Sequence, residues 1–287
     1  MPDLQGRFPD GVTGWPTGPV LEDTGERMLP EKAGAAPFWE HIYRYRFAIR
    51  FVRGRRVLDI ACGEGYGAAA LARAGAASVI GIDLSEEACE HARQKYGVDA
   101  RSSDAHRIPL PDRSVDVIVS FETIEHLNTP TAFLDECVRL LAPGGTLVIS
   151  TPNREAFHEA AIANPFHCSE MTQAEFVSLL GPRFKSWQWY TQRLRSAGKW
   201  SARSLAVEIS PWRQSRGYYR LRARAASLCP HLGDMRGGVE DRYRQSPVET
   251  ILAQDRRFAC RVNPYAIMKQ SRVTREQPYY FIAVVRV

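Results

Sequence analysis

The sequence predicts an α/β fold in which helices cover both faces of a mainly parallel sheet. Short apolar segments that resemble buried strands, such as Val57–Ile60 and Val79–Asp83, alternate with Ala-rich or amphipathic segments at helical spacing. The first strand runs directly into a turn spaced by Gly63, Gly65 and Gly67, which a helix-forming segment follows. A strand, a glycine turn and a helix N-terminus in this order are typical of a ligand site at the carboxyl edge of a parallel sheet.

Local signals place the other elements. Ser85 is a helix cap, and Gly97 ends the helix that it opens. Thr172 and Glu175 form a capping box for a helix that Gly181 closes. We expect further helices and strands, in chain order, at Phe38–Val52, Ala68–Ala77, Asp99–Ser103, Val115–Ser120, Thr129–Ala142, Thr146–Thr151, Glu155–Ile162, Phe184–Tyr190 and Tyr279–Val287.

Length and composition indicate a globular protein with one α/β domain and additions. The 287 residues are 44% apolar and 24% charged, and no run approaches the length of a membrane span. The N-terminus does not resemble a signal peptide, and the six cysteines form no C-x-x-C pair, so we expect free thiols and a cytoplasmic protein. The expected parts are an N-terminal arm with the first helix (1–50), the core (51–192), an inserted basic segment (193–274) and the final core strand (275–287).

The glycine turn carries a family resemblance. The segment D-x-A-C-G-E-G-x-G begins at Asp59, and the second strand ends in Asp83, about 20 residues after the first glycines. This pattern resembles the class I S-adenosylmethionine (SAM)-dependent methyltransferases, whereas dinucleotide enzymes carry G-x-G-x-x-G. An ordinary βαβ turn that binds nothing is the alternative. The resemblance implies a Rossmann-like seven-stranded methyltransferase sheet and SAM contacts by Asp59, Ala61, Gly63, Gly65, Asp83, Leu84, Asp104, Ala105 and Glu122.

A cluster of chemically active residues follows the fourth strand. Glu122, Glu125 and His126 stand at i, i+3 and i+4, so a helical turn there would point all three side chains the same way. Two carboxylates and an imidazole suit Mg²⁺ or Mn²⁺ with open positions for substrate oxygens. His167 is a candidate fourth ligand, with His158 as its competitor.

The E-x-x-E-H set resembles that of small-RNA 3′-terminal 2′-O-methyltransferases, which add a later metal-binding His, and of ubiquinone-pathway O-methyltransferases. Bacterial methyltransferases of surface-glycan and antibiotic-sugar pathways are similar too, including the T-P-N and N-P-F-H segments at Thr151 and Asn164. In many class I enzymes the same letters bind no metal, and the first Glu only shapes the SAM pocket. With a metal, an alcohol held near the methyl group could be deprotonated by His126 or His167, with Glu125 as the third catalytic residue.

The insertion predicts an anionic partner. Between residues 182 and 228 the only acid is Glu208, whereas arginines and lysines alternate with aromatic residues. This composition suits a phosphate-bearing acceptor, single-stranded RNA or an anionic membrane surface, with a solvated basic face as the alternative. A second prediction is that Thr24–Glu31, which contains G-E-R, covers SAM or the acceptor, unless it is only a surface loop.

The leading hypothesis is a metal-assisted, SAM-dependent O-methyltransferase that acts on a sugar or nucleoside hydroxyl in natural-product or glycan biosynthesis. Three alternatives stay open at this point: a 2′-O-methyltransferase of RNA, a metal-free methyltransferase of a phenol or amine, and a SAM-binding subunit without catalysis. RNA is less favoured because no recognisable RNA-binding module is present and the first 40 residues are not basic. The intact glycine turn, Asp83 and Glu122 disfavour the non-catalytic subunit.

Overall fold

A computed structural model describes part of the chain: residues 21, 27–33, 35–159, 164–192, 246–252, 267–269 and 278–287. Most of the predicted N-terminal arm and of the basic insertion, including Arg193 to Arg224, lies outside the described residues. The anionic partner that the insertion predicts therefore stays a prediction. No helix among the described residues is long and apolar enough to cross a bilayer.

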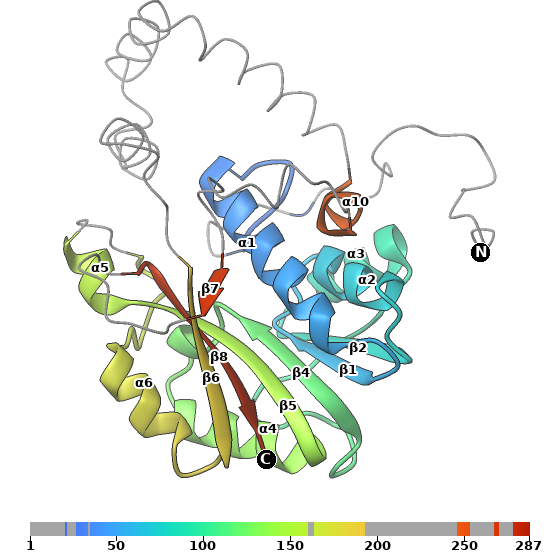
Figure 1. Ribbon diagram of the computed structural model, residues 1–287. Coiled ribbons are helices and arrows are strands. Elements are labelled where there is room, and N and C mark those ends of the chain that lie inside the picture. The colour runs from blue at the N-terminus through green and yellow to red at the C-terminus, as the bar shows by residue number, and fades with distance from the viewer. Residues whose placement is uncertain are drawn as a thin grey trace, which may run out of the picture.

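The described residues form a central sheet with helices on both faces, as predicted (Figure 1). The strands are β1 (Arg56–Ile60), β2 (Ser78–Asp83), β3 (Asp99–Ser102), β4 (Val115–Phe121), β5 (Leu141–Pro152), β6 (Ser186–Gln192), β7 (Ile267–Lys269) and β8 (Tyr280–Arg286). The helices are α1 (Ala35–Ala48), α2 (Tyr66–Arg73), α3 (Glu86–Tyr96), α4 (Pro130–Leu140), α5 (Arg154–Glu159), α6 (Gln173–Leu180) and α10 (Pro247–Leu252), with 3-10 turns η1 (Ile49–Phe51) and η2 (Ile124–His126).

The strand order is β3-β2-β1-β4-β5-β8-β6-β7. Strands β1 to β5 pair in parallel, whereas β8 runs antiparallel between β5 and β6. The predicted seven-stranded sheet is thus confirmed, with a three-residue strand, β7, added at one edge from the segment predicted as an insertion. Because β1 to β5 are parallel, their carboxyl ends share one edge, where the glycine turn, Asp83 and the Glu122 segment all lie.

Several predicted boundaries differ from the structure: the first helix ends at Ala48 and not at Val52, and the second ends at Arg73 and not at Ala77. The helix expected to reach Ala142 ends at Leu140, and β5 begins at Leu141, because Leu141 already pairs with Val115 across a register shift in the β4–β5 ladder. The caps of α3 and α6 are confirmed: Ser85 Oγ accepts a hydrogen bond from the Ala88 N–H, and the capping box of Thr172 is complete.

A polar contact joins helix α1 to strand β1 beneath the glycine turn. Its Tyr45 hydroxyl lies 3.2 and 3.1 Å from the two carboxylate oxygens of Asp59, which is on β1 and fully buried. The Tyr45 ring also lies directly against Gly67 of α2, where a Cβ would stand 2.0 Å from the ring. Helices α1, α2 and α10 cover this face of the sheet, and α4 and α6 cover the other.

We predict that Gly67→Ala lowers the free energy of unfolding by about 2 kcal/mol, because the new methyl group forces Tyr45 out of its place. Alanine would otherwise favour this helical position by about 1 kcal/mol. Urea denaturation measures the change. The control is Gly97→Ala, whose Cβ would meet nothing within 4 Å and whose φ of 67° alone costs about 1 kcal/mol. A Gly67→Ala protein at least as stable as the wild type would contradict this packing.

Candidate active site

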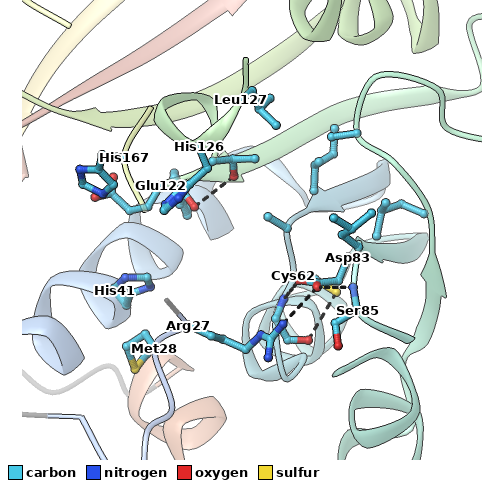
Figure 2. Close-up of a pocket in the computed structure, with 18 of the residues that line it drawn as sticks. Arg27, Met28, His41, Cys62, Asp83, Ser85, Glu122, His126, Leu127 and His167 are labelled. Atoms are coloured by element: carbon cyan, nitrogen blue, oxygen red, sulfur yellow. Dashed lines mark hydrogen bonds and ion pairs between the residues drawn. The ribbon is translucent and has the colours of Figure 1, made fainter. Parts of the chain in front are cut away.

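A cavity of about 1050 Å³ opens at the carboxyl edge of the parallel strands (Figure 2). The segments that follow β1, β2, β3 and β4 line it, and α1, residues 27–33 and Tyr280 on β8 complete the wall. Pockets for one small-molecule ligand measure roughly 300 to 1,000 Å³. The cavity is therefore large enough for a nucleotide-sized ligand and a second small molecule beside it.

The glycines of the first turn have different roles. Gly63 lines the cavity, as predicted. Gly65 does not: it has a φ of 94°, and a Cβ there would lie 2.5 Å from the Cβ of Ala92 on α3. Gly67 has no side chain, and this leaves room for the Tyr45 ring beside it. In this structure Gly65 and Gly67 permit close packing of helices, and the predicted contact between Gly65 and SAM stays a prediction.

Asp83 stands at the cavity rim, where a ribose-binding carboxylate was predicted. Its two oxygens accept hydrogen bonds from the backbone N–H groups of Gly63, at 2.9 Å, and of Ser85, at 3.0 Å. The Arg27 guanidinium lies 3.5 Å away. The two backbone bonds fix the carboxylate orientation toward the cavity.

Asp59 does not line the cavity, although a direct ligand contact was predicted for it. Tyr45 covers its carboxylate, and burial raises its pKa to about 8, although the Tyr45 hydrogen bond partly counteracts that rise. In this structure Asp59 holds α1 in place beneath the glycine turn. A contact between Asp59 and a ligand stays a prediction.

Residues suited to a flat aromatic ring lie beyond Asp83. Leu84 is 79% exposed, which is unusual for a leucine, and it lines the cavity with Ala61, Ala105 and Asp104. The Asp104 carboxylate accepts hydrogen bonds from the backbone N–H and the ring of His106, which lower its pKa. Asp104 is one of the predicted SAM contacts, and it stands at the cavity wall.

The predicted alignment of Glu122 with Glu125 and His126 is wrong. The 3-10 turn η2 begins only at Ile124, and Glu122 has a φ of 53°, so the three residues do not share one helical face. Glu122 instead accepts a hydrogen bond from the Ser150 hydroxyl of β5, at 2.7 Å. It still lines the cavity, 4.0 Å from the buried Arg44 guanidinium.

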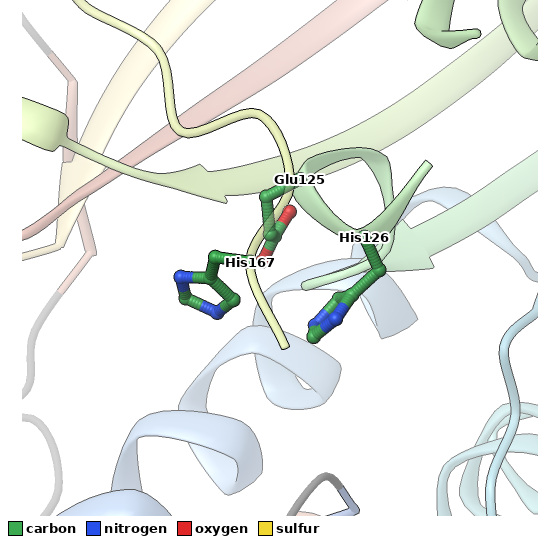
Figure 3. Close-up of side chains that lie close together, drawn as sticks. All are labelled: Glu125, His126 and His167. Atoms are coloured by element: carbon green, nitrogen blue, oxygen red, sulfur yellow. The ribbon is translucent and has the colours of Figure 1, made fainter. Parts of the chain in front are cut away.

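Glu125, His126 and His167 lie close together (Figure 3), and the two histidines line the cavity. One potential ligand atom from each lies within 4.8 Å of the others. The Glu125 side chain is fully buried; Thr151 donates to its Oε2, and its Oε1 has no hydrogen-bond partner among the described residues. Burial and the nearby Glu122 charge raise its pKa. A divalent cation would satisfy this buried oxygen, so the three residues fit a metal.

Both histidines of this group are held by their second ring nitrogen. His126 Nδ1 lies 3.0 Å from the Phe166 carbonyl, and His167 Nδ1 lies 2.6 Å from a Glu170 carboxylate oxygen. Each Nδ1 therefore carries the proton, which leaves the lone pair on Nε2. Metal-binding histidines typically show this arrangement. The His167 Nε2 now accepts from the Asn164 amide at 2.9 Å, so a metal would replace that amide.

Helix α1 and β8 contribute cavity residues that the sequence did not predict. His41 and Tyr280 line the wall, and the His41 ring lies 3.2 Å from the Tyr66 hydroxyl. Burial and the neighbouring Arg44 lower the pKa of His41, so its ring is neutral. The available signal was the i, i+4 spacing of His41 and Tyr45 on the predicted helix Phe38–Val52.

The core of the chain matches a known protein family and several of its relatives. Residues 58–149 match the family described as a methyltransferase domain. A probable S-adenosylmethionine-dependent methyltransferase of Mycolicibacterium smegmatis is 43% identical over 166 residues, which cover 56% of this chain and 64% of that protein. A ubiquinone biosynthesis O-methyltransferase of Parvibaculum lavamentivorans is 40% identical over 112 residues, or 37% of this chain and 44% of that protein. The chain thus matches less than two thirds of the length of either.

The crystal structure of a SAM-dependent methyltransferase from Archaeoglobus fulgidus shares the fold. It aligns with a TM-score of 0.53 and 18% identity, covering 88% of this chain and 95% of that one. The predicted Rossmann-like methyltransferase sheet is therefore confirmed. Residues 58–149 match a methyltransferase domain, and the Mycolicibacterium smegmatis relative is a probable SAM-dependent methyltransferase by name.

We predict that Asp59→Asn makes the protein gain stability relative to the wild type as the pH rises. The folded wild type keeps a proton on Asp59 up to about pH 8, whereas the unfolded chain releases it near pH 4. The contribution of Asp59 to the free energy of unfolding of the wild type therefore falls as the pH rises from about 4 to about 8. Asparagine does not titrate, so the variant lacks this loss of stability. Denaturant unfolding at pH 5 and pH 7.5 measures it.

The control for this prediction is Asp116→Asn. A hydrogen bond from Arg56 lowers the pKa of Asp116, so its carboxylate is ionised in both states above about pH 5. The difference in the free energy of unfolding between Asp116→Asn and the wild type should stay constant between the two pH values. A constant difference for Asp59→Asn as well would show that Asp59 is ionised in the folded protein.

Proposed function

We propose that this protein is a SAM-dependent O-methyltransferase that acts, with a divalent metal, on a hydroxyl of a glycosyl or nucleoside compound. One observation carries the proposal: a single cavity joins the glycine turn and Asp83 at one end to His126 and His167 at the other, and the buried Glu125 lies beside these two histidines. The relative from Parvibaculum lavamentivorans is an O-methyltransferase by name, which supports oxygen as the methyl acceptor. Free thiols at the four described cysteines are consistent with the predicted cytoplasmic location.

In this proposal the glycine-turn end holds the donor. Asp83 would accept hydrogen bonds from the ribose hydroxyls, and Leu84 and Ala105 would flank the adenine with Asp104 at its edge. The donor supplies an electrophilic methyl group on a positively charged sulfur. The chain has to hold the acceptor oxygen in line with that methyl group and exclude water.

At the other end, Glu125, His126 and His167 would hold the metal, which lowers the pKa of a bound hydroxyl. His126 lines the cavity, so a metal held there would lie beside the acceptor hydroxyl. With Nε2 of both histidines on the metal and both Nδ1 atoms protonated, the hydroxyl proton would pass to water. Because Glu122 is directed to Ser150, the donor set is two imidazoles and one carboxylate, not the predicted oxygen-rich set. Such a set favours Mn²⁺ over Mg²⁺.

We predict that Asp83→Asn weakens the binding of S-adenosylhomocysteine at least about tenfold, because charge-assisted hydrogen bonds to the ribose are lost. Isothermal titration calorimetry measures the dissociation constant. The matched control is Asp99→Asn, an aspartate paired with Arg101 on the outer strand β3, which should leave the affinity unchanged. Equal affinities for the wild type and Asp83→Asn would remove Asp83 from the donor site.

A second prediction concerns the metal. Glu125→Gln should weaken Mn²⁺ binding at least about tenfold, because an anionic ligand is replaced by a neutral one. Titration followed by the electron paramagnetic resonance of free Mn²⁺ measures this. Glu122→Gln is the control, and it should change the affinity less, since Glu122 lies outside the ligand group.

Metal-free methylation of a phenol or amine is the rival function for the same cavity. Protein that is treated with EDTA and keeps full activity, with no gain on adding Mn²⁺ or Mg²⁺, would favour that rival. Activity on an RNA 3′ end in preference to sugars and nucleosides would instead favour the 2′-O-methyltransferase.

A further inference from the structure

Arg27 crosses the floor of the cavity between the two groups that the donor would contact. Its side-chain carbons lie 3.5 Å from the position of a Cβ on Gly63, and its guanidinium ends 3.5 Å from Asp83 Oδ1 (Figure 2). A ligand that runs along Gly63 and bonds to Asp83 meets this side chain directly. Arg27 must therefore move when such a ligand binds.

The contact between Arg27 and Asp83 is weak enough to exchange. Its N–O distance of 3.5 Å is at the limit for a hydrogen bond, and the Arg27 side chain is 22% exposed. Asp83 already accepts two shorter bonds from backbone N–H groups, so its orientation does not depend on Arg27. The guanidinium can leave without disturbing the carboxylate.

The backbone next to Arg27 is anchored, so only the side chain has to move. Leu29 is buried against Ala88 of α3, and Glu31 pairs with Lys95 of α3 at 2.5 Å. The Arg27 side chain stays attached at the cavity rim, and its reach covers the glycine turn.

The donor carries a charged group that Arg27 can bind in place of Asp83. Its amino-acid end carries a carboxylate, and arginine binds carboxylates in a bidentate manner. Among the described residues, the arginines and lysines that line the cavity are Arg27 and Lys32, and the Lys32 ammonium already donates to the Leu21 carbonyl. His41, also in the wall, is neutral. Arg27 is therefore the cation that is best placed for that carboxylate.

We propose that Arg27 exchanges partners when the donor binds. Its guanidinium leaves Asp83, whose oxygens take the ribose hydroxyls, and bonds to the carboxylate at the amino-acid end of the donor. This inference rests on the proposed function, because it needs SAM as the ligand. It assigns Arg27 as a donor-binding residue that also shields Asp83 in the free protein.

The test compares two probes by calorimetry: S-adenosylhomocysteine, which has the amino-acid end, and 5′-methylthioadenosine, which lacks it. Arg27→Gln should weaken S-adenosylhomocysteine binding at least about tenfold, because a charge-assisted bond is lost. Binding of 5′-methylthioadenosine should stay equal or strengthen, because the competitor for Asp83 is gone. Lys32→Gln is the matched control on the same segment and should change the affinity ratio of the two probes less than twofold.

The outcomes separate this inference from the proposed function. An equal change for both probes, or no change for S-adenosylhomocysteine, overturns the partner exchange while leaving the donor site in place. Wild-type protein that binds neither probe overturns the proposed function and this inference with it. Circular dichroism and the melting temperature of Arg27→Gln confirm that the variant is folded.

Discussion

The hydrogen bond from Tyr45 to Asp59 is the contact on which the site depends. It joins α1 to the first strand at the level of the glycine turn. Helix α1 forms one wall of the cavity through His41 and Tyr45. The Tyr45 ring lies against Gly67 and leaves no room for a side chain there. The glycine turn and α1 therefore form one packed unit.

The buried guanidinium of Arg44 connects the elements that form the opposite wall of the cavity. The Arg44 guanidinium is 1% exposed, lies 4.6 Å from the Tyr280 ring centre and bonds to Gln192 at 2.9 Å. It stands between Glu122 and Glu40, whose pKa burial raises to about 7. One cation from α1 thus connects the segment after β4 with the last two long strands, and it neutralises charge next to Glu125. Losing it would leave two partly buried carboxylates, Glu40 and Glu122, without their cation.

The sequence predicted the fold well because the relevant signals are local. Strand composition, the Ser85 cap and the Thr172 capping box are each decided within a few residues. It also predicted the position of Asp83 correctly, because the last residue of a parallel strand lies at the carboxyl edge of the sheet. The corner after β4 was harder. Glu122 takes a left-handed backbone that spacing cannot reveal, and its partner Ser150 lies 28 residues away. Ala61 after β1 shares this conformation at the same edge, with a φ of 59°.

The donor end and the metal corner were predicted as one site, and their relation is the central claim of this account. The most direct test is nuclear magnetic resonance of bound SAM labelled with ¹³C at the sulfur methyl group, titrated with Mn²⁺. The account predicts that Mn²⁺ broadens the methyl signal more strongly than the adenine signals, because the methyl group faces Glu125, His126 and His167. Adenine signals broadened as much as the methyl signal, or more, would contradict it.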